Sequence, residues 1–178
     1  MEFHSTMLCH AYLVVLDPVH DGRGFFARTF CTEEFAVHGL EANFPQHSTS
    51  FSIRKGTLRG MHYQREPGSE VKLVRCTRGA ILDVIIDIRP DSPTYRRWQK
   101  FELSATNRHQ LYIPKGFAHG FQTLSDDVEV NYLISTPHRP DLAGGIRYND
   151  PAFGITWPLS VTQISEKDLR WPDYSQRT

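Results

Sequence analysis

The sequence predicts one all-β domain, built as a sandwich or a closed barrel. Its 178 residues contain eight apolar or alternating runs of strand length, whereas helical patterns are few. Turn-forming pairs such as Asp21-Gly22 and Lys55-Gly56 separate the runs. At roughly 100 to 200 residues per domain, the length fits a single domain over residues 1–178.

The expected strands follow one another along most of the chain. They cover residues 12–16, 57–63, 71–77, 80–88, 99–103, 110–113, 121–124 and 128–134. The first run ends a longer apolar stretch, 7–16, which we interpret as the first strand because it is far shorter than the roughly 18 residues of a membrane span. Residues 80–88 are apolar on both faces except at Asp83 and Asp87, which predicts a central strand covered on both sides.

Two short helices and one long connection complete the expected elements. Thr32 can N-cap a helix that ends near Gly39, and Ser165 can N-cap one turn that contains Asp168. The proline- and glycine-rich segment 137–150 is interpreted as a lid or a subunit contact. The last residues, 175–178, are expected to fray.

Composition argues against several classes of partner. Lysine plus arginine and aspartate plus glutamate each total 20, so the formal net charge is zero and nucleic acid is not an expected partner. No segment predicts a membrane span. The three cysteines, Cys9, Cys31 and Cys76, have no CxxC spacing, so neither a disulfide framework nor a thiolate zinc site is expected. A cytoplasmic protein fits this cysteine usage.

Four ionisable side chains are the first candidates for chemistry. Arg59 and His62 lie three positions apart, so strict alternation sends them to opposite faces unless a bulge at Gly60 brings both inward. Lys72 has apolar neighbours and must reach the rim or meet an anion in a pocket, unless it merely protects an edge strand. Tyr132 packs on a strand and acquires chemistry only beside a base.

Asp168 has two interpretations from its position on a capped turn. It can orient a histidine by accepting from Nδ1–H, or it can pair with Lys167 at the surface. Arg23 lies between two glycines, which permit close approach of a phosphate.

Residues 113–121 carry the spacing proline, one residue, glycine, two residues, histidine, which ends at His119. This spacing is similar to the second signature of the cupin jelly roll. Metal-binding cupins supply HxH and a glutamate in their first signature, whereas the matching segment here reads His62-Tyr63-Gln64. Too few ligands remain for a transition metal, so no metal is expected.

Taken together, the motifs resemble one family, the dTDP-4-dehydrorhamnose 3,5-epimerases, in order and over nearly the whole chain. The segments that carry the resemblance are 21–26, 56–64, 72–75, 91–95, 113–121, 149–151 and 165–168. The resemblance implies a metal-free, cofactor-free cupin jelly roll that forms homodimers. It also implies epimerisation of a nucleotide-linked 4-keto-6-deoxy sugar, with dTDP as the expected nucleotide, during deoxysugar synthesis.

The resemblance also assigns roles to residues. It implies that His62 is the base that removes the proton beside the ketone, that Asp168 holds its imidazole, that Lys72 stabilises the enolate oxygen, and that Tyr132 returns a proton on the opposite face. Such chemistry requires a base, an oxyanion donor and a second proton source. The implied substrate-binding residues are Arg23, Arg28, Gln46, Ser48, Arg59, His119, His138 and Lys167. Arg23 is expected to reach the neighbouring subunit's site.

The sequence departs from the family pattern around the nucleotide. Arg28 stands where rhamnose-pathway members usually have glutamate, and Ser48 ends a motif that is usually QxN. His138 replaces a base-stacking tyrosine, and Ala143 replaces a frequent glutamate. The sequence therefore leaves base and sugar specificity open.

Three alternatives remain from the sequence. One is a relative that inverts only C3 or only C5, which the same residues can serve. Another is a metal-dependent cupin with its metal near His62 and His119. The last is a non-catalytic sugar-nucleotide binding protein, disfavoured because His62, Lys72, Tyr132 and Asp168 are all present.

Overall fold

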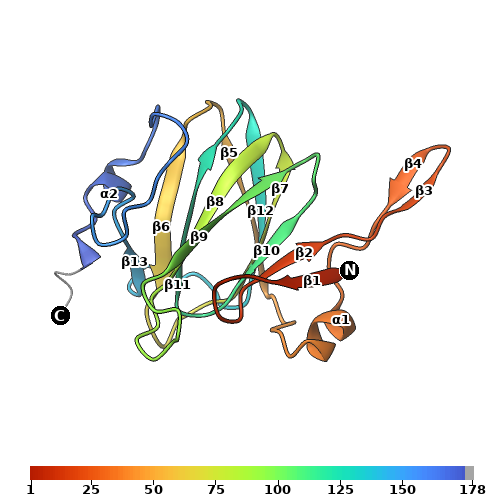
Figure 1. The fold of residues 1–178 in the computed structure, drawn as a ribbon, viewed down its shortest axis with the longest axis horizontal. Helices are drawn as coiled ribbons and strands as arrows, with labels where there is room; N and C mark the ends of the chain where they lie inside the picture. The colour runs from red at the N-terminus through yellow and green to blue at the C-terminus, as the bar shows by residue number, and fades with distance from the viewer. Residues whose placement is uncertain (175–178) are drawn as a thin grey trace.

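The computed structural model describes residues 1–174 and has two facing β-sheets and one projecting hairpin (Figure 1). The all-β prediction is confirmed. Residues 175–178, which the sequence predicts to fray, lie outside the described residues. Within residues 1–174, no helix has the length and apolar character needed to cross a membrane.

The six-stranded sheet has the order β1-β2-β10-β7-β12-β5, and all its neighbours are antiparallel. Its strands are β1 (Glu2–Ser5), β2 (Tyr12–Val15), β5 (Gln46–Ser52), β7 (Lys72–Arg78), β10 (Gln110–Ile113) and β12 (Val128–Ile134).

The five-stranded sheet has the order β13-β6-β11-β8-β9, again with antiparallel neighbours. Its strands are β6 (Leu58–Gln64), β8 (Ala80–Asp87), β9 (Trp98–Ser104), β11 (Phe117–Thr123) and β13 (Ala143–Gly145). From β5 to β13 the chain changes sheet at every connection except the one between β8 and β9. Residues close in sequence therefore come to face one another across the space between the sheets.

Three apolar clusters follow from the alternation of side chains along the strands. The cluster between the sheets includes Val74, Ile81, Ile85 and Val130. A second cluster covers the outer face of the six-stranded sheet and includes Phe35 of helix α1 (Thr32–Val37). A third covers the outer face of the five-stranded sheet. Its members Val84 and Ile86 alternate with Ile81 and Ile85, which confirms that β8 is a central strand covered on both sides.

Each of the eight expected runs overlaps a strand, but two local expectations are wrong. The stretch 7–16 is not the first strand, because β1 precedes it and residues 6–11 form a turn closed by Thr6 N–H to Ala11 O. Helix α1 is N-capped by Cys31 rather than Thr32, and no side chain caps it. The connection 137–150, expected as a lid or a subunit contact, also contains the short strand β13, which the sequence did not predict and which pairs with β6.

The predicted irregularity at Gly60 is present. Across β6 and β11, His62 is opposite His119 and Arg59 is opposite Phe121, so two residues of β6 oppose Gly120. A Cβ on Gly60 would lie 2.5 Å from the Gly120 Cα, so glycine is required for this close approach. The bulge brings Arg59 and His62 to the same side of the strand, as predicted.

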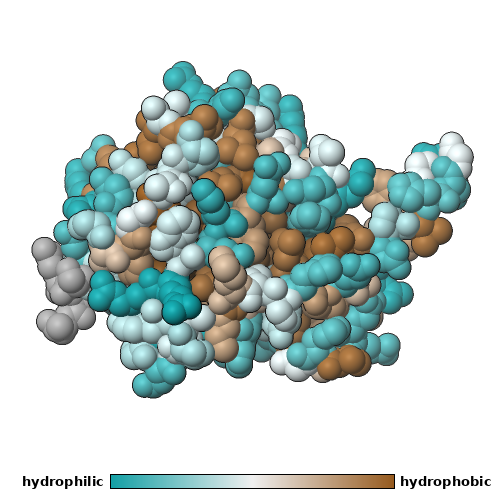
Figure 2. Space-filling view, in the orientation of Figure 1, coloured by the Kyte–Doolittle hydropathy of each residue, from teal (hydrophilic) through white to brown (hydrophobic). Residues whose placement is uncertain are grey.

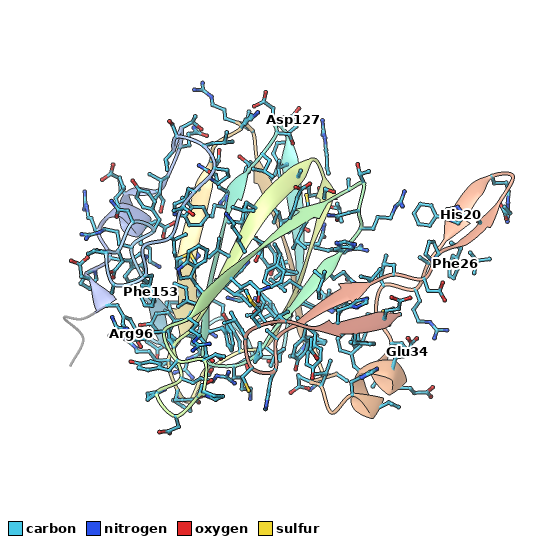
Figure 3. The ribbon with its side chains drawn as sticks, viewed as in Figure 1. His20, Phe26, Glu34, Arg96, Asp127 and Phe153 are labelled. Carbon is cyan, nitrogen blue, oxygen red and sulfur yellow. The ribbon has the colours of Figure 1, made fainter. Side chains whose placement is uncertain are left out.

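The hairpin formed by β3 (Val19–Asp21) and β4 (Gly24–Phe26) projects away from both sheets (Figure 1). His20 and Phe26 lie on it, well away from the body of the molecule (Figure 3). The Phe26 side chain is 77% exposed and Val19 is 71% exposed. Hydrophobic surface also reaches the region where the hairpin leaves the body (Figure 2).

Candidate active site

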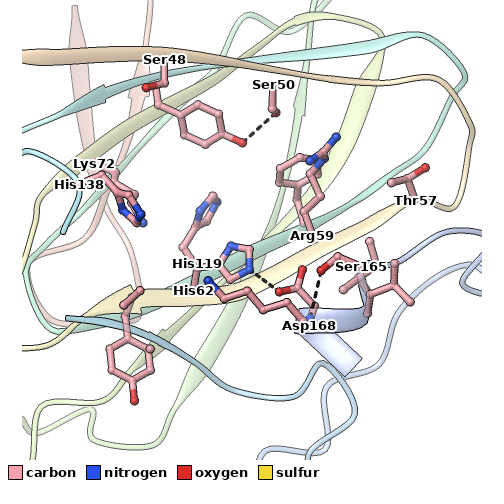
Figure 4. Close-up of a pocket in the computed structure, with 18 of the residues that line it drawn as sticks. Ser48, Ser50, Thr57, Arg59, His62, Lys72, His119, His138, Ser165 and Asp168 are labelled. Atoms are coloured by element: carbon pink, nitrogen blue, oxygen red, sulfur yellow. Dashed lines mark hydrogen bonds and ion pairs between the residues drawn. The ribbon is translucent and has the colours of Figure 1, made fainter. Parts of the chain in front are cut away.

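A pocket of about 980 Å³ opens between the two sheets. It lies next to the apolar cluster between the sheets that includes Val74 and Val130, called the inner cluster below. Strands β6, β11 and β13 line it from one sheet, and β5, β7 and β12 line it from the other. The C-terminal segment 161–171, with helix α2 (Glu166–Leu169), closes one side. Ten of the twelve expected site residues line this pocket, and Figure 4 shows most of them.

The shortest contact between the expected catalytic residues joins His62 to Asp168. The His62 Nε2 atom lies 2.7 Å from the Asp168 Oδ1 atom, as Figure 4 shows. The imidazole is 45% exposed, whereas the carboxylate is only 6% exposed. An ionised carboxylate is an acceptor only, so Nε2 is the donor, and in the neutral ring the lone pair is then on Nδ1. The expectation that Asp168 binds Nδ1–H is therefore wrong, because the ring presents its other nitrogen.

Asp168 is held in place by several donors. Its carboxylate also accepts from the backbone N–H of Gly60 and from Trp171 Nε1, each at 3.3 Å. Ser165 caps the turn as predicted, since its Oγ accepts from the Asp168 N–H at 3.1 Å. Burial opposes ionisation of Asp168, but hydrogen bonds from His62 and Gly60 outweigh it and lower the pKa of the carboxyl group. The charge that orients His62 is thus present at neutral pH.

Tyr132 lies on the opposite sheet from His62, on the inner face of β12. Its hydroxyl is 3.2 Å from Ser50 Oγ. The phenol ring meets the His119 ring edge-on, with centroids 6.3 Å apart. Burial raises the pKa of the Tyr132 hydroxyl, so the group stays protonated at neutral pH and can serve as a proton donor.

Lys72 lies in the pocket and meets an anion, one of the three outcomes that the sequence left open. Its Nζ atom is 2.8 Å from Glu70 Oε1, and the two side chains are only 13% and 10% exposed. The alternation of β7 places Lys72 on the same face as Val74, which belongs to the inner cluster. An ammonium group is therefore available between the sheets, close to the strands that carry His62 and Tyr132.

A second histidine–aspartate pair joins His119, which lines the pocket, to Asp83 of β8. His119 Nε2 is 2.7 Å from Asp83 Oδ2, and both side chains are almost fully buried. Burial raises the pKa of Asp83, and the other oxygen of its carboxylate has no hydrogen-bond partner among the described residues. Within residues 1–174, no three His, Cys, Asp or Glu side chains are grouped so that they could hold a metal ion.

The residues expected at the nucleotide end also line the pocket. They are Gln46, Ser48, Arg59, His138 and Lys167, with Ala143 beside them. Arg59 is fixed by Nε donating to Ser52 Oγ and by Nη2 donating to the Phe51 carbonyl. The backbone of His138 is fixed by donating to Gln46 Oε1 at 2.9 Å.

Two expected binding residues, Arg23 and Arg28, lie outside the pocket of their own chain. The Arg23 side chain is 91% exposed at the tip of the projecting hairpin and pairs with Asp21. Arg28 pairs with Glu34 of helix α1, where its side chain is 62% exposed. The structure thus does not bring these two arginines together with the other ten residues.

Sequence reasoning missed several residues that shape the site. Glu70 and Trp171 line the pocket, and Asp83 supports His119. Asp83 had a visible signal, because a carboxylate in an otherwise apolar strand requires a partner. Glu70 had a weaker signal. It lies two positions before Lys72, and side chains two positions apart on an extended chain point to the same side. Trp171 follows the last short helix and had none.

Comparison with known proteins gives one consistent family. The model of the dTDP-4-dehydrorhamnose 3,5-epimerase family matches residues 5–176. A protein of that name from Sinorhizobium fredii is 41% identical over 173 residues, which are 97% of this chain and 89% of the relative. The protein of the same name from Methanothermobacter thermautotrophicus is 44% identical, over 96% and 92% of the two chains.

Solved structures agree with the sequence comparison. The dTDP-4-dehydrorhamnose 3,5-epimerase of Bacillus anthracis, with TDP and pyrophosphate bound, has a TM-score of 0.94 at 37% identity and covers 97% of this chain and 98% of its own. A 3'-monoepimerase from Streptomyces bikiniensis in complex with dTDP-quinovose has a TM-score of 0.88 at 31% identity, over 96% and 86% of the chains. These similarities confirm the expected cupin-type jelly roll.

Proposed function

Because the chain belongs to the dTDP-4-dehydrorhamnose 3,5-epimerase family, we propose that it inverts C3 and C5 of a dTDP-linked 4-keto-6-deoxyhexose in deoxysugar synthesis. The protein is thus an isomerase. One observation carries the assignment of roles: a carboxylate-oriented histidine on one sheet and a protonated tyrosine on the other line the same pocket. Inversion at carbon requires a base and an acid on opposite faces of the sugar ring.

In the proposed reaction, His62 Nδ1 takes the proton from the carbon beside the ketone. The electron pair of the broken C–H bond moves into the ring and onto the ketone oxygen, which becomes an enolate oxygen. Tyr132 then gives its proton to the other face of the same carbon, where the enolate electron pair forms the new C–H bond as the ketone is restored. Proton exchange with water removes the proton from His62 and returns one to Tyr132. Nothing is oxidised or reduced overall, so the scheme calls for no redox cofactor. Asp168 supports the step by keeping the His62 ring fixed and by stabilising its protonated form.

Lys72 is proposed to stabilise the enolate oxygen. A donor aimed at a developing oxyanion can account for roughly 2.7 to 4 kcal/mol of the barrier. The same ketone oxygen is shared by the reactions at C3 and C5, because both carbons flank C4. One ammonium group therefore suffices for both inversions, whereas proton removal has to be repeated after the sugar has presented its second carbon.

The nucleotide is proposed to bind along Gln46, Ser48, Arg59, His138 and Lys167. Arginine binds phosphate oxygens in a bidentate manner and suits a diphosphate. His138 offers a smaller ring than tyrosine for stacking on the base, and Ala143 offers no hydrogen bond from its side chain. Base preference is accordingly where this protein is expected to differ most from its relatives.

Three free thiols support a cytoplasmic setting.

A homodimer is part of the proposal. Arg23 sits at the tip of a hairpin that projects from the body, and Val19 and Phe26 expose large apolar side chains on that hairpin. Exposed apolar side chains on a projecting element are typical of a subunit contact. In the proposed dimer each hairpin packs on the neighbouring copy, and Arg23 of one chain completes the other chain's diphosphate site.

The test of the proposed reaction is incubation with dTDP-4-keto-6-deoxy-D-glucose in D₂O, followed by mass spectrometry and NMR. We expect deuterium at C3 and at C5, with inverted configuration, and a loss of about 10²- to 10⁴-fold in rate for His62→Ala. His4→Ala is the matched control, since His4 is exposed and pairs with Glu2 away from the pocket. Absence of His62-dependent exchange contradicts the proposal.

Labelling of one carbon alone identifies a monofunctional epimerase. Similarity to the 3'-monoepimerase from Streptomyces bikiniensis makes this the second candidate. The proposed roles of His62, Tyr132 and Lys72 are the same in both cases, so only the deuterium positions separate them.

A further inference from the structure

Glu70 is the immediate partner of the proposed enolate-stabilising lysine. The two side chains belong to one extended segment, where Val71 between them exchanges hydrogen bonds with Ser135. Residues two apart on such a segment point to the same side. Glu70 Oε1 accepts from Lys72 Nζ at 2.8 Å, and neither side chain is more than 13% exposed.

The second oxygen of Glu70 is held as firmly as the first. Gln64 Nε2 donates to Glu70 Oε2 at 2.6 Å and to the Gly68 carbonyl at 2.9 Å. Gln64 itself is only 5% exposed, and its Oε1 accepts from the Arg139 backbone N–H at 2.6 Å. Both carboxylate oxygens of Glu70 are thus fixed by buried donors. The Gln64 amide, which holds one of these oxygens, is itself fixed by the Arg139 backbone N–H.

This arrangement matters because of the nature of lysine. An ammonium group sits at the end of four flexible carbons, and ordering that side chain costs conformational entropy. Oxyanion stabilisation depends on donors that are already in position when the charge develops. A fixed, buried carboxylate meets that need, because it orders the ammonium before substrate arrives.

We infer that Glu70, held by Gln64, is a positioning residue for the Lys72 ammonium group. The inference rests on the proposed function, because it assigns Glu70 a role in the step that Lys72 performs. The inference predicts that loss of Glu70 affects the turnover step and not the binding of the nucleotide. Gln64 acts on both, because its bond to the Arg139 backbone also fixes the residue that follows His138.

The decisive variant is Glu70→Gln, measured for kcat and KM with dTDP-4-keto-6-deoxy-D-glucose. The amide replaces one carboxylate oxygen with an NH2 donor, so Lys72 and Gln64 no longer each have an acceptor oxygen of their own. We expect kcat to fall on the order of 10- to 100-fold, the range for lost hydrogen bonds to charged groups, with KM changed less than about twofold. Deuterium exchange at C3 and at C5 should fall in the same proportion, because one enolate oxygen serves both carbons.

Glu66→Gln is the matched control. Glu66 lies in the same connection between β6 and β7, is exposed, and makes no hydrogen bond or ion pair with the residues that the structure describes. It should leave kcat and KM unchanged. Gln64→Met should lower kcat and raise KM together, which distinguishes a residue connected to both ends of the site from one connected to Lys72 alone.

Two results overturn the inference. One is an unchanged kcat in folded Glu70→Gln, and the other is a rise in KM with kcat intact. If Glu70→Gln does not fold, Glu70→Asp takes its place: the shorter carboxylate keeps the charge but cannot reach both partners, so the same fall in kcat is expected and an unchanged kcat overturns the inference. Wild-type turnover in the same assay tests the proposed function separately.

Discussion

At the scale of single residues, the proposed mechanism assigns proton removal and proton return to different side chains. Tyr132→Phe separates them, because it removes only the hydroxyl and keeps the ring against the inner cluster. We expect inversion to slow by about 10²- to 10⁴-fold, while His62-dependent exchange of deuterium with retained configuration persists. NMR in D₂O measures both rates in one experiment.

The matched control for that prediction is Tyr12→Phe. Tyr12 packs in the cluster on the outer face of the six-stranded sheet, away from the pocket. Unchanged inversion in Tyr132→Phe, or equal loss of inversion and exchange, contradicts the assignment of Tyr132 as the acid.

The sequence predicts which residues gather in the pocket better than how they touch. His62 and Asp168 are 106 positions apart, and their pairing was expected only from the family resemblance. The choice of Nε2 over Nδ1 depends on the rotation of one ring, which no residue pattern encodes. Glu70 escaped attention because a carboxylate two positions from a lysine also describes an ordinary solvated pair.

At the scale of elements, the end of β8 depends on a buried ionised carboxylate. Asp87 Oδ2 accepts from Arg89, Ser92 and Thr94, at 2.7, 2.5 and 2.6 Å. Burial opposes ionisation, but these hydrogen bonds outweigh it and hold the pKa of Asp87 below its ordinary value. The carboxylate therefore stabilises the fold fully above its ordinary pKa near 4, and this stabilisation is lost as pH falls through the lowered value.

We accordingly expect Asp87→Asn to lower the free energy of unfolding by roughly 3 kcal/mol or more at pH 7, because Arg89 loses its charged partner. The difference from the wild type should shrink as the pH falls below about 4, since the wild-type carboxylate then becomes protonated. Urea denaturation across this pH range measures it. Asp91→Asn, at an exposed position in the same turn, is the control, and a difference that grows toward acid contradicts the account.

Regular elements were easier to predict from the sequence than irregular ones. Strands with apolar alternation, such as β10 and β12, begin and end at the expected residues. Strands β3, β4 and β13 were missed because they have only three residues each, and β5 was missed because its polar run lacks an apolar pattern. Its even-numbered residues Gln46, Ser48 and Ser50 face the pocket, so the pattern of β5 follows its function rather than core packing.

At the scale of the whole molecule, one chain provides ten of the twelve expected site residues in its pocket and keeps Arg23 at a distance. The proposed dimer explains this separation, since a hairpin that serves a neighbouring copy has no reason to fold back. The exposed apolar side chains Val19 and Phe26 then become buried in the subunit contact. Closed two-fold symmetry makes the exchange reciprocal, so each dimer has two shared sites.

A shared site predicts complementation between two inactive proteins. Arg23→Ala removes the arginine that a chain lends, and His62→Ala removes the base that it keeps, so each homodimer alone should be nearly inactive. When the two proteins are unfolded together and refolded in equal amounts, a mixed dimer contains one intact site, formed by His62 of one chain and Arg23 of the other. Random pairing should therefore restore about a quarter of wild-type activity. If the mixture stays inactive although mass spectrometry shows that mixed dimers have formed, Arg23 does not act in the neighbouring site.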